Sequence, residues 1–193
     1  MLFRSSNNTA VGYQAGYTNS TGTRLTAVGY QAGYISNANA NTFVGQAAGQ
    51  YSTGATNTAV GDSSQSSAVG AQGTGGNNSS LGYGSLGNVT SGAYNTAIGA
   101  IALLANTTGN NNTVVGYQAL YTNSTGASNV AIGYQALYTD NSNTSVAVGT
   151  QAGYTATGTL NTFIGNGSGY SMTSGARNTI LGCYSGKIGR AHV

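Results

Sequence analysis

The residues that could carry chemistry are few and far apart in this chain. Asp62 and Asp140 are the only carboxylates, and neither has a histidine or lysine at a matching place in the sequence pattern. Acid–base catalysis and metal binding each need several such groups gathered at one site. We therefore predict that the chain is not an enzyme and has no catalytic residues, no cofactor and no metal site.

The remaining reactive and charged residues are equally scattered. Cys183 is the only cysteine, so an intramolecular disulfide is excluded and we interpret it as a filler residue. The formal net charge is +3, but the basic residues stand singly, whereas phosphate binding requires them to cluster. They are Arg4, Arg24, Arg177, Lys187 and Arg190. We predict no nucleic-acid partner, and the apolar runs are too short for a signal peptide or a membrane span.

A glycine that follows an apolar pair recurs roughly every 16–17 residues along most of the chain, and such a period is typical of a solenoid. Glycine at this place in every copy indicates a positive φ angle or a lack of room for a Cβ atom. These anchor glycines, which we predict to form structural turns, are Gly12, Gly29, Gly45, Gly61, Gly82, Gly99, Gly116, Gly133, Gly149, Gly165 and Gly182. Gly70 breaks step between two of them and would mark a twelfth unit.

Each unit reads as two short strands joined by turns. The residues before the anchor glycine follow the pattern Asn-Thr-Ala-Val-Gly, in which β-branched residues favour extended backbone. A second segment after the glycine, such as Tyr-Gln-Ala-Leu-Tyr at residues 117–121, has a small residue at its third place. We predict an all-β parallel β-solenoid with about 12 coils, each of roughly 16–17 residues. Its predicted core is the apolar residue before each glycine: Val11, Val28, Val44, Val60, Ile98, Val115, Ile132, Val148, Ile164 and Leu181.

Asparagine recurs just before the first strand of most units, for example at Asn41, Asn57 and Asn112. Two interpretations are open. The side chains could stack as an amide ladder along the solenoid axis, or asparagine could simply tolerate the turn conformation.

The repeats define the organisation of the chain. Residues 1–7 form a lead-in and residues 8–186 form the repeat domain. Residues 187–193 depart from the repeat and back-translate to the start of a common sequencing adapter, so we exclude them as an artefact of an assembled metagenomic sequence. Because no polar capping unit is visible at either end, we expect the chain to be a fragment of a longer protein.

Once aligned, the repeats resemble a known family. Residues 8–12 and 129–133 resemble the Asn-Ser-Val-Ala-Ile-Gly repeats of the YadA-like heads of trimeric autotransporter adhesins, and the Tyr-Gln-Ala-Leu-Tyr version is similar to repeats in phage tail fibres. The resemblance covers about residues 8–186. It implies a left-handed β-roll, a homotrimer, and an extracellular location on a cell surface or virion. The units here are longer than those of the adhesin heads, so no specific ligand carries over.

Two functions from different classes are consistent with these repeats. The first is a structural and adhesive shaft of a surface adhesin or tail fibre that contacts host-cell glycans or surface proteins. Its candidate surface-binding residues are Tyr17, Tyr34, Tyr121, Tyr138 and Tyr154, although these rings could merely pack between coils. The alternative is an ice-binding β-solenoid, because threonine ranks such as Thr9, Thr26 and Thr42 can order water. We rank this alternative lower, since the valine that shares the threonine face is expected to turn inward.

Overall fold

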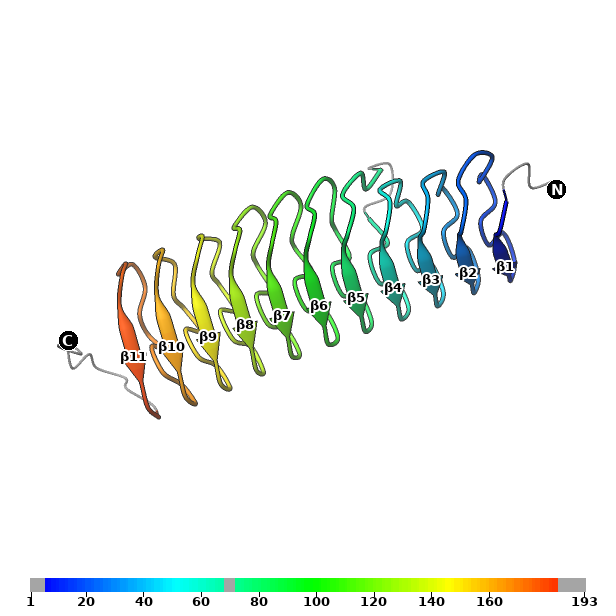
Figure 1. Cartoon of the computed structure of the whole chain (residues 1–193). Coiled ribbons are helices and arrows are strands. Elements are labelled where there is room, and N and C mark those ends of the chain that lie inside the picture. The colour runs from blue at the N-terminus through cyan, green and yellow to red at the C-terminus, as the bar shows by residue number, and fades with distance from the viewer. Residues whose placement is uncertain (1–5, 68–71, 184–193) are drawn as a thin grey trace.

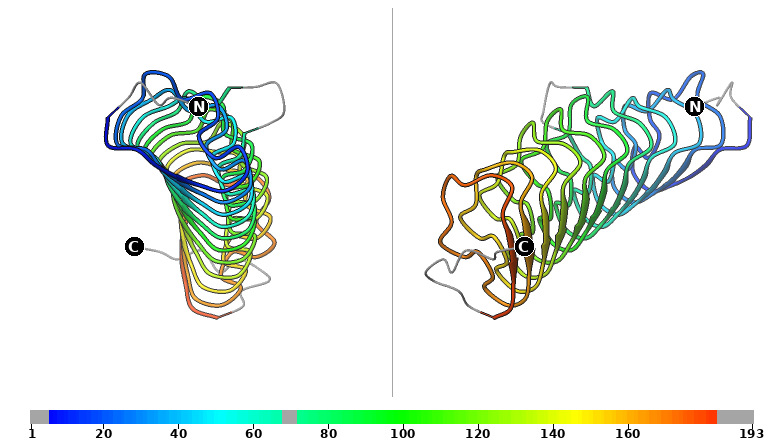
Figure 2. Two further views of the ribbon diagram at one scale, coloured as in Figure 1. Left: turned by 90° about the vertical axis from the view of Figure 1, so that its right-hand side faces the viewer. Right: turned by 60° about the vertical axis from the view of Figure 1, so that its left-hand side comes forward.

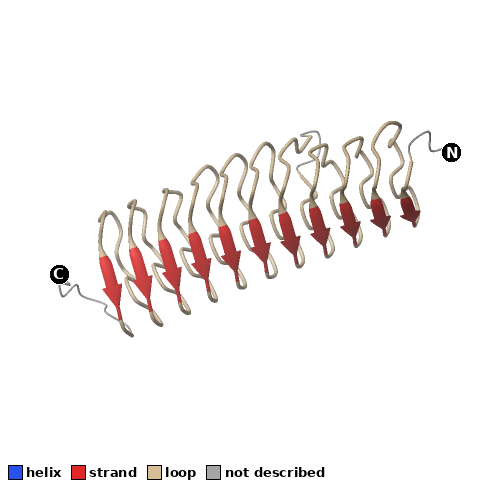
Figure 3. Cartoon of the chain, in the orientation of Figure 1, coloured by secondary structure: helices blue, strands red, loops and turns tan. Residues whose placement is uncertain are grey.

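The computed structural model describes residues 6–67 and 72–183, which form a parallel β-solenoid with one short strand per coil (Figure 1). The eleven strands form a single sheet in chain order, and no helix occurs in the described ranges (Figure 3). The predicted all-β parallel solenoid is confirmed. The strands are β1 (Thr9–Val11), β2 (Thr26–Val28), β3 (Thr42–Val44), β4 (Thr58–Val60), β5 (Ser79–Leu81), β6 (Thr96–Ile98), β7 (Thr113–Val115), β8 (Val130–Ile132), β9 (Val146–Val148), β10 (Thr162–Ile164) and β11 (Thr179–Leu181).

Neighbouring strands pair in register, so each place in the unit lies above the same place in the next coil. For example, Thr9 pairs with Thr26 and Val11 pairs with Val28. Parallel pairing along the whole row places β1 and β11 at opposite ends of an elongated body, and successive coils rotate progressively about its axis (Figure 2). The repeat in the sequence therefore becomes a set of straight columns of equivalent side chains on the surface and in the interior.

The number of coils is lower than the sequence predicts. β4 pairs directly with β5, with Thr58 beside Ser79, so no coil lies between them. The unit predicted around Gly70 falls on residues 68–71, outside the described residues. The described ranges therefore contain eleven strands, with β5 directly following β4 in the sheet, where we predicted about 12 coils.

The second segment of each unit is not the predicted strand. Its residues form turns, with positive φ angles of 54° at Gln118 and 49° at Leu120. The segment still bonds to the next coil, because the Leu120 amide donates to the Ala136 carbonyl at 2.9 Å. Its small third residue faces a narrow interior, since Ala119 and Ala136 are fully buried. Hydrogen bonding between coils thus continues through backbone that is not extended.

Each anchor glycine has a left-handed backbone, and all of them except Gly182, in the last described coil, also closely contact the coil that follows. Gly116 has φ +135°, and a Cβ atom added to it would lie 2.4 Å from the carbonyl oxygen of Gly133. Gly133 stands in the same relation to Gly149. Both reasons given by the sequence for a glycine at this place are therefore present, and each would alone disfavour any other residue.

The predicted core is wrong about which face of the strand points inward. The middle residue of every strand from β2 to β10 is buried, and the apolar residue before the anchor glycine points outward. The predicted core residues are all partly or largely exposed: Val11, Val28, Val44, Val60, Ile98, Val115, Ile132, Val148, Ile164 and Leu181. The physical reason for this arrangement is the narrow interior of the coil. The coil is too narrow for a row of branched side chains opposite the second segment, so most of the inward places hold alanine.

Asparagine before the strand forms a buried ladder. The backbone amide of Asn112 donates to Asn95 Oδ1 at 3.0 Å, and the side-chain Nδ2 of Asn112 donates to the Gly126 carbonyl at 3.0 Å. Asn129 repeats the first bond onto Asn112. These side chains are almost completely buried. The predicted ladder along the axis is confirmed, and the side chains of Asn112 and Asn129 also bond the backbone of a turn, a role that neither interpretation included.

Candidate functional surface

The outward side of the strands forms a continuous surface that runs the length of the solenoid and turns with its coils (Figure 2). We call this surface the sheet face. It consists of two rows, one of Thr, Ser or Val from the first strand position and one of Val, Ile or Leu from the third. In mid-stack, Leu81 is 49% exposed and Ile164 is 43% exposed. No charged residue occurs in any of the strands. A continuous apolar row without charge is uncommon on the surface of a monomer.

Tyrosines form two further columns outside the strands. The late tyrosine column lies five residues after the anchor glycine and contains Tyr17 stacked on Tyr34, and a run of four stacked rings: Tyr121, Tyr138, Tyr154 and Tyr170. The early tyrosine column lies directly after the glycine, where Tyr13 stacks on Tyr30 and Tyr117 on Tyr134. Sequence reasoning named five members of the late column but missed Tyr170 and the early column, although both follow the same spacing.

The stacking determines which part of each ring is available to a partner. In the four-ring run, centroids are 5.0 to 5.2 Å apart and the planes differ by 6° to 12°. The faces of the inner rings are therefore covered by their neighbours, which leaves edges and hydroxyl groups facing solvent. Partial burial, together with the negative charge of the neighbouring phenolates of Tyr138 and Tyr170, raises the pKa of Tyr154. Tyr154 therefore remains a neutral phenol at physiological pH.

Glutamine side chains that follow the early-column positions in the sequence form hydrogen-bonded ladders between coils. Gln135 Nε2 donates to Gln118 Oε1 at 2.7 Å, and Gln151 Nε2 donates to Gln135 Oε1 at 3.0 Å. Gln31 and Gln14 are joined in the same way. Since each glutamine is adjacent to an early-column position, the ladders restrict the backbone that carries those rings.

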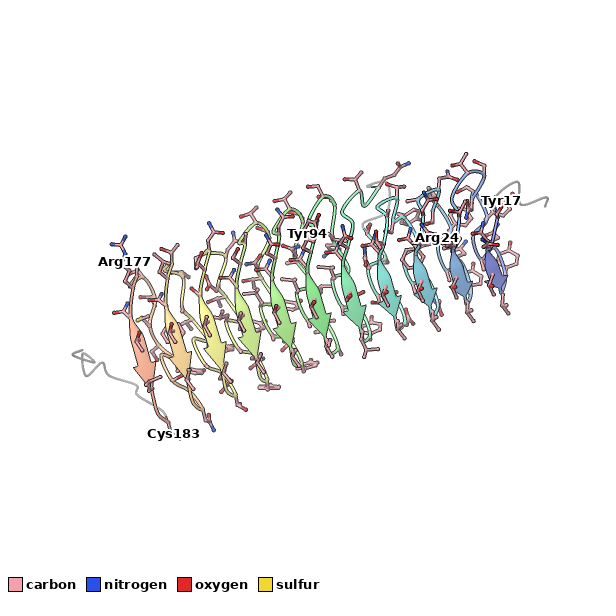
Figure 4. The ribbon with its side chains drawn as sticks, viewed as in Figure 1. Tyr17, Arg24, Tyr94, Arg177 and Cys183 are labelled. Atoms are coloured by element: carbon pink, nitrogen blue, oxygen red, sulfur yellow. The ribbon has the colours of Figure 1, made fainter. Side chains whose placement is uncertain are left out.

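The other residues considered for chemistry stay isolated in the structure. Asp62 is exposed and accepts a hydrogen bond from the Ser63 hydroxyl at 2.6 Å. Cys183 is an exposed free thiol. Arg24 and Arg177 lie near opposite ends of the solenoid (Figure 4). Within the described ranges, no three His, Cys, Asp or Glu side chains lie close enough to hold a metal ion.

Asp140 is the one ionisable group in the interior of the described coils. It occupies the same place in its coil as Asn106 and Asn123 in the two preceding coils, and all three side chains are fully buried. Asp140 Oδ1 accepts from the Ser142 amide at 2.7 Å, whereas Oδ2 has no protein partner within the described ranges. Burial raises the pKa of the Asp140 carboxyl above its ordinary value of 3.8, and hydrogen bonds from Ser142 and Ser145 only partly oppose this.

We expect Asp140→Asn to stabilise the solenoid at neutral pH by about 1–3 kcal/mol, because asparagine removes the buried negative charge and its desolvation cost. The folded state binds the Asp140 proton more tightly than the unfolded state. Its stability is therefore highest below pH 3.8 and falls as the pH rises through the folded pKa. Urea unfolding between pH 3 and 7 measures this. Asp140→Asn should remove the fall, and the exposed control Asp62→Asn should leave it unchanged; equal curves for all three proteins would refute the assignment.

Comparison with protein-family models, curated proteins and solved structures produced no significant match. Function must therefore be argued from the surfaces themselves. Within the described ranges the chain offers no helix that would be long and apolar enough for a bilayer.

Proposed function

We propose that this chain is a segment of a structural shaft that assembles with copies of itself through the sheet face. The observation that carries the proposal is the outward Val, Ile and Leu row, which continues through all eleven strands. A partner that covers this row over its whole length must present apolar side chains with the spacing of the coils. A second copy of the same solenoid does so at every coil.

The charge distribution is consistent with self-association. Exposed strands in soluble monomers usually carry charged residues that discourage association, and the sheet face has none. The resemblance to the adhesin heads favours three copies. A homotrimer would bury three such rows around a common axis and leave the rest of each coil outside.

The oligomeric state tests this proposal. Size-exclusion chromatography with light scattering should give about three times the chain mass of 19.1 kDa. Val115→Lys, Ile132→Lys and Val148→Lys, combined in one variant, should weaken association at least about a hundredfold, because each apolar side chain contributes roughly 1.5 kcal/mol or more when buried. The circular dichroism spectrum should stay unchanged, since these side chains point away from the interior.

A matched control carries the same added charge away from the strands. Thr108→Lys, Thr159→Lys and Thr173→Lys change exposed residues between strands, so this variant should keep the mass of the parent protein. A parent protein that is monomeric at all concentrations would contradict the shaft assembly.

One observation favours the ice-binding alternative. The reason for ranking it lower was that the valine turns inward, and the structure shows that it turns outward beside the threonine. Thr9, Thr58 and Thr113 are exposed on the same sheet face. Both functions would use the sheet face, so the parent protein and the lysine variant described above can distinguish between them. Ice binding is supported if the parent protein is a monomer with thermal hysteresis and the lysine variant has none. The shaft is supported if the parent protein is an oligomer without thermal hysteresis.

The adhesive part of the proposal concerns the late tyrosine column. Because the inner ring faces are covered, contact with a glycan would use the hydroxyl groups and ring edges of Tyr121, Tyr138 and Tyr154. Replacing these three by phenylalanine keeps the stack and removes the hydroxyls. We expect glycan-array binding to fall at least about tenfold, in line with the loss of hydrogen bonds of about 1 kcal/mol each. Unchanged binding by this variant would remove the column from the adhesive site.

A further inference from the structure

The late tyrosine column has a geometry that bears on covalent chemistry. Tyr154 lies between Tyr138 and Tyr170, with ring centroids 5.0 Å away on both sides and planes within 12° of parallel. Tyr121 extends the run beyond Tyr138 with a centroid distance of 5.2 Å. Each ring therefore has its nearest phenol in the adjacent coil, at the same place in the repeat.

The backbone holds these rings in place. The Thr139 amide donates to the Tyr154 carbonyl at 3.1 Å, and the Thr139 hydroxyl donates to the same oxygen at 3.1 Å. Thr155 repeats both bonds onto Tyr170. The backbone segments that carry neighbouring tyrosines thus cannot separate without breaking the hydrogen bonds between coils. They are also partly exposed to solvent, so an oxidant in solution can reach them.

We propose that the late tyrosine column is a site of oxidative cross-linking, at which neighbouring phenols couple to dityrosine when a haem peroxidase and hydrogen peroxide act on the surface. Each of two adjacent phenols loses one electron and one proton to give a phenoxyl radical. The two radicals then form a carbon–carbon bond between the ring positions ortho to the hydroxyls, and each ring recovers its aromaticity by losing the ortho hydrogen to its phenol oxygen. The two electrons and two protons reduce one peroxide molecule to two water molecules.

The stack makes coupling within one chain faster than coupling between chains. A phenoxyl radical on Tyr154 has a phenol neighbour on either side before any diffusion occurs. The product joins adjacent coils covalently and closes a loop that is one coil long. Such a closure restricts the unfolded chain, and we expect it to raise the unfolding midpoint by roughly 5 °C. This inference does not depend on self-association through the sheet face.

Two exposed tyrosines outside the stacks, Tyr83 and Tyr94, show whether solvent exposure alone decides which rings are oxidised. Tyr83 and Tyr94 are each 62% exposed, more than any ring of the late column, and neither is stacked on another ring in the described ranges. Tyr94 is seen among the other labelled side chains in Figure 4. If exposure alone decided the reaction, Tyr83 and Tyr94 would react first and would link separate molecules.

The experiment treats the full chain at low concentration with peroxidase and hydrogen peroxide. Dityrosine fluorescence should appear in a band of monomer mass on a denaturing gel. Elastase peptides analysed by mass spectrometry should contain Tyr138 joined to Tyr154, or Tyr154 joined to Tyr170, with the loss of two hydrogen atoms. Tyr154→Phe keeps the ring but eliminates two of the three neighbouring pairs of the four-ring run, so those peptides should disappear.

Tyr83→Phe should leave the yield in the column unchanged. Dityrosine found mainly between molecules, dityrosine found mainly at Tyr83 or Tyr94, or no dityrosine at all would each overturn the proposal. Tyr154→Phe retains the stack, so circular dichroism is expected to match the parent protein, and a loss of cross-links then reports chemistry and not folding.

Discussion

Gly116→Ala is expected to destabilise the solenoid by about 3–5 kcal/mol, because the added methyl group meets both a conformational cost and a backbone clash. The residue has φ +135°, a conformation that costs a non-glycine residue roughly 1–3 kcal/mol. The new Cβ would also lie 2.4 Å from the Gly133 carbonyl oxygen and 2.7 Å from its carbonyl carbon. Neither atom can move away freely, because the Gly133 amide is bonded to the Val115 carbonyl at 2.8 Å. The urea midpoint of unfolding measures the loss.

Gly84→Ala is the matched control for a positive φ without a backbone clash. Gly84 has φ +60°, and its added Cβ would meet only side-chain atoms, the nearest being Ile101 Cγ2 at 3.2 Å. The chain already places Ala47 and Gln118 at the equivalent position, with φ 52° and 54°. We expect a loss below about 1 kcal/mol.

Gly182→Ala separates the two contributions at the anchor position itself. Gly182 has φ +120°, and no atom of the described residues lies within 4 Å of its added Cβ. Only the conformational cost then applies, so we expect roughly 1–3 kcal/mol, measured by hydrogen exchange of the β11 amides because an end coil frays locally. If Gly116→Ala cost no more than Gly182→Ala, close approach of backbones would not explain the anchor glycines.

The sequence predicted these glycines well because their cause is local and repeated. A residue that never varies in eleven otherwise variable units indicates a backbone constraint. The parallel, in-register pairing follows from the same repeat, because equal units can stack in one register only. The asparagine ladder was one of two interpretations open from the sequence, and the structure confirms it. The additional bonds from these side chains to turn carbonyls appear only in the structure.

Which face of the strand points into the interior was harder to predict. Alternation shows that Thr113 and Val115 share one face and Val114 takes the other, but it does not say which face is inside. We placed the branched row inside because burial usually favours larger apolar residues. The overlooked signal lies in the small residues of the second segment, such as Ala119: they indicate an interior too narrow for that row. The turn conformation of residues such as Leu120, with φ 49°, could not be predicted because leucine rarely adopts it.

A second signal was an exchange of volume between two inward positions. In two coils the strand contributes alanine, Ala97 or Ala131, and the second segment contributes leucine, Leu103 or Leu137. In the coils of Ala27 and Ala147 the second segment has glycine instead, Gly33 or Gly153, which lies against the phenylalanine of the next coil. Where the strand contributes phenylalanine, the second segment has glycine. Cβ atoms built on Gly153 and Gly169 would lie 2.6 and 2.4 Å from the ring of Phe163. One phenylalanine therefore fills space in its own coil and in the preceding one.

Phe163→Ala is accordingly expected to cost about 3–5 kcal/mol, the usual loss for a fully buried aromatic residue. The ring lies in the main buried cluster, together with Leu137 and Met172. Its removal leaves a cavity bordered by two glycines, which have no side chains to fill it. Urea unfolding at fixed protein concentration measures the loss, and the concentration must be held constant because self-association would add to the apparent stability.

The repeat itself suggests the compensating change. Adding Gly169→Leu to Phe163→Ala reproduces the alanine and leucine pair of the β8 coil, and Leu137 already adopts φ 51° at the place where Gly169 has φ 64°. We expect the double variant to regain about half of the loss, since the side chain refills one of the two spaces. Gly169→Leu alone should destabilise, because its Cβ would lie 2.4 Å from the Phe163 ring. The two substitutions are each harmful and mutually corrective, so a double-mutant cycle must show favourable coupling. Additive losses would mean that the two positions do not share one interior space, and the narrow-coil explanation for the outward valines would fail with them.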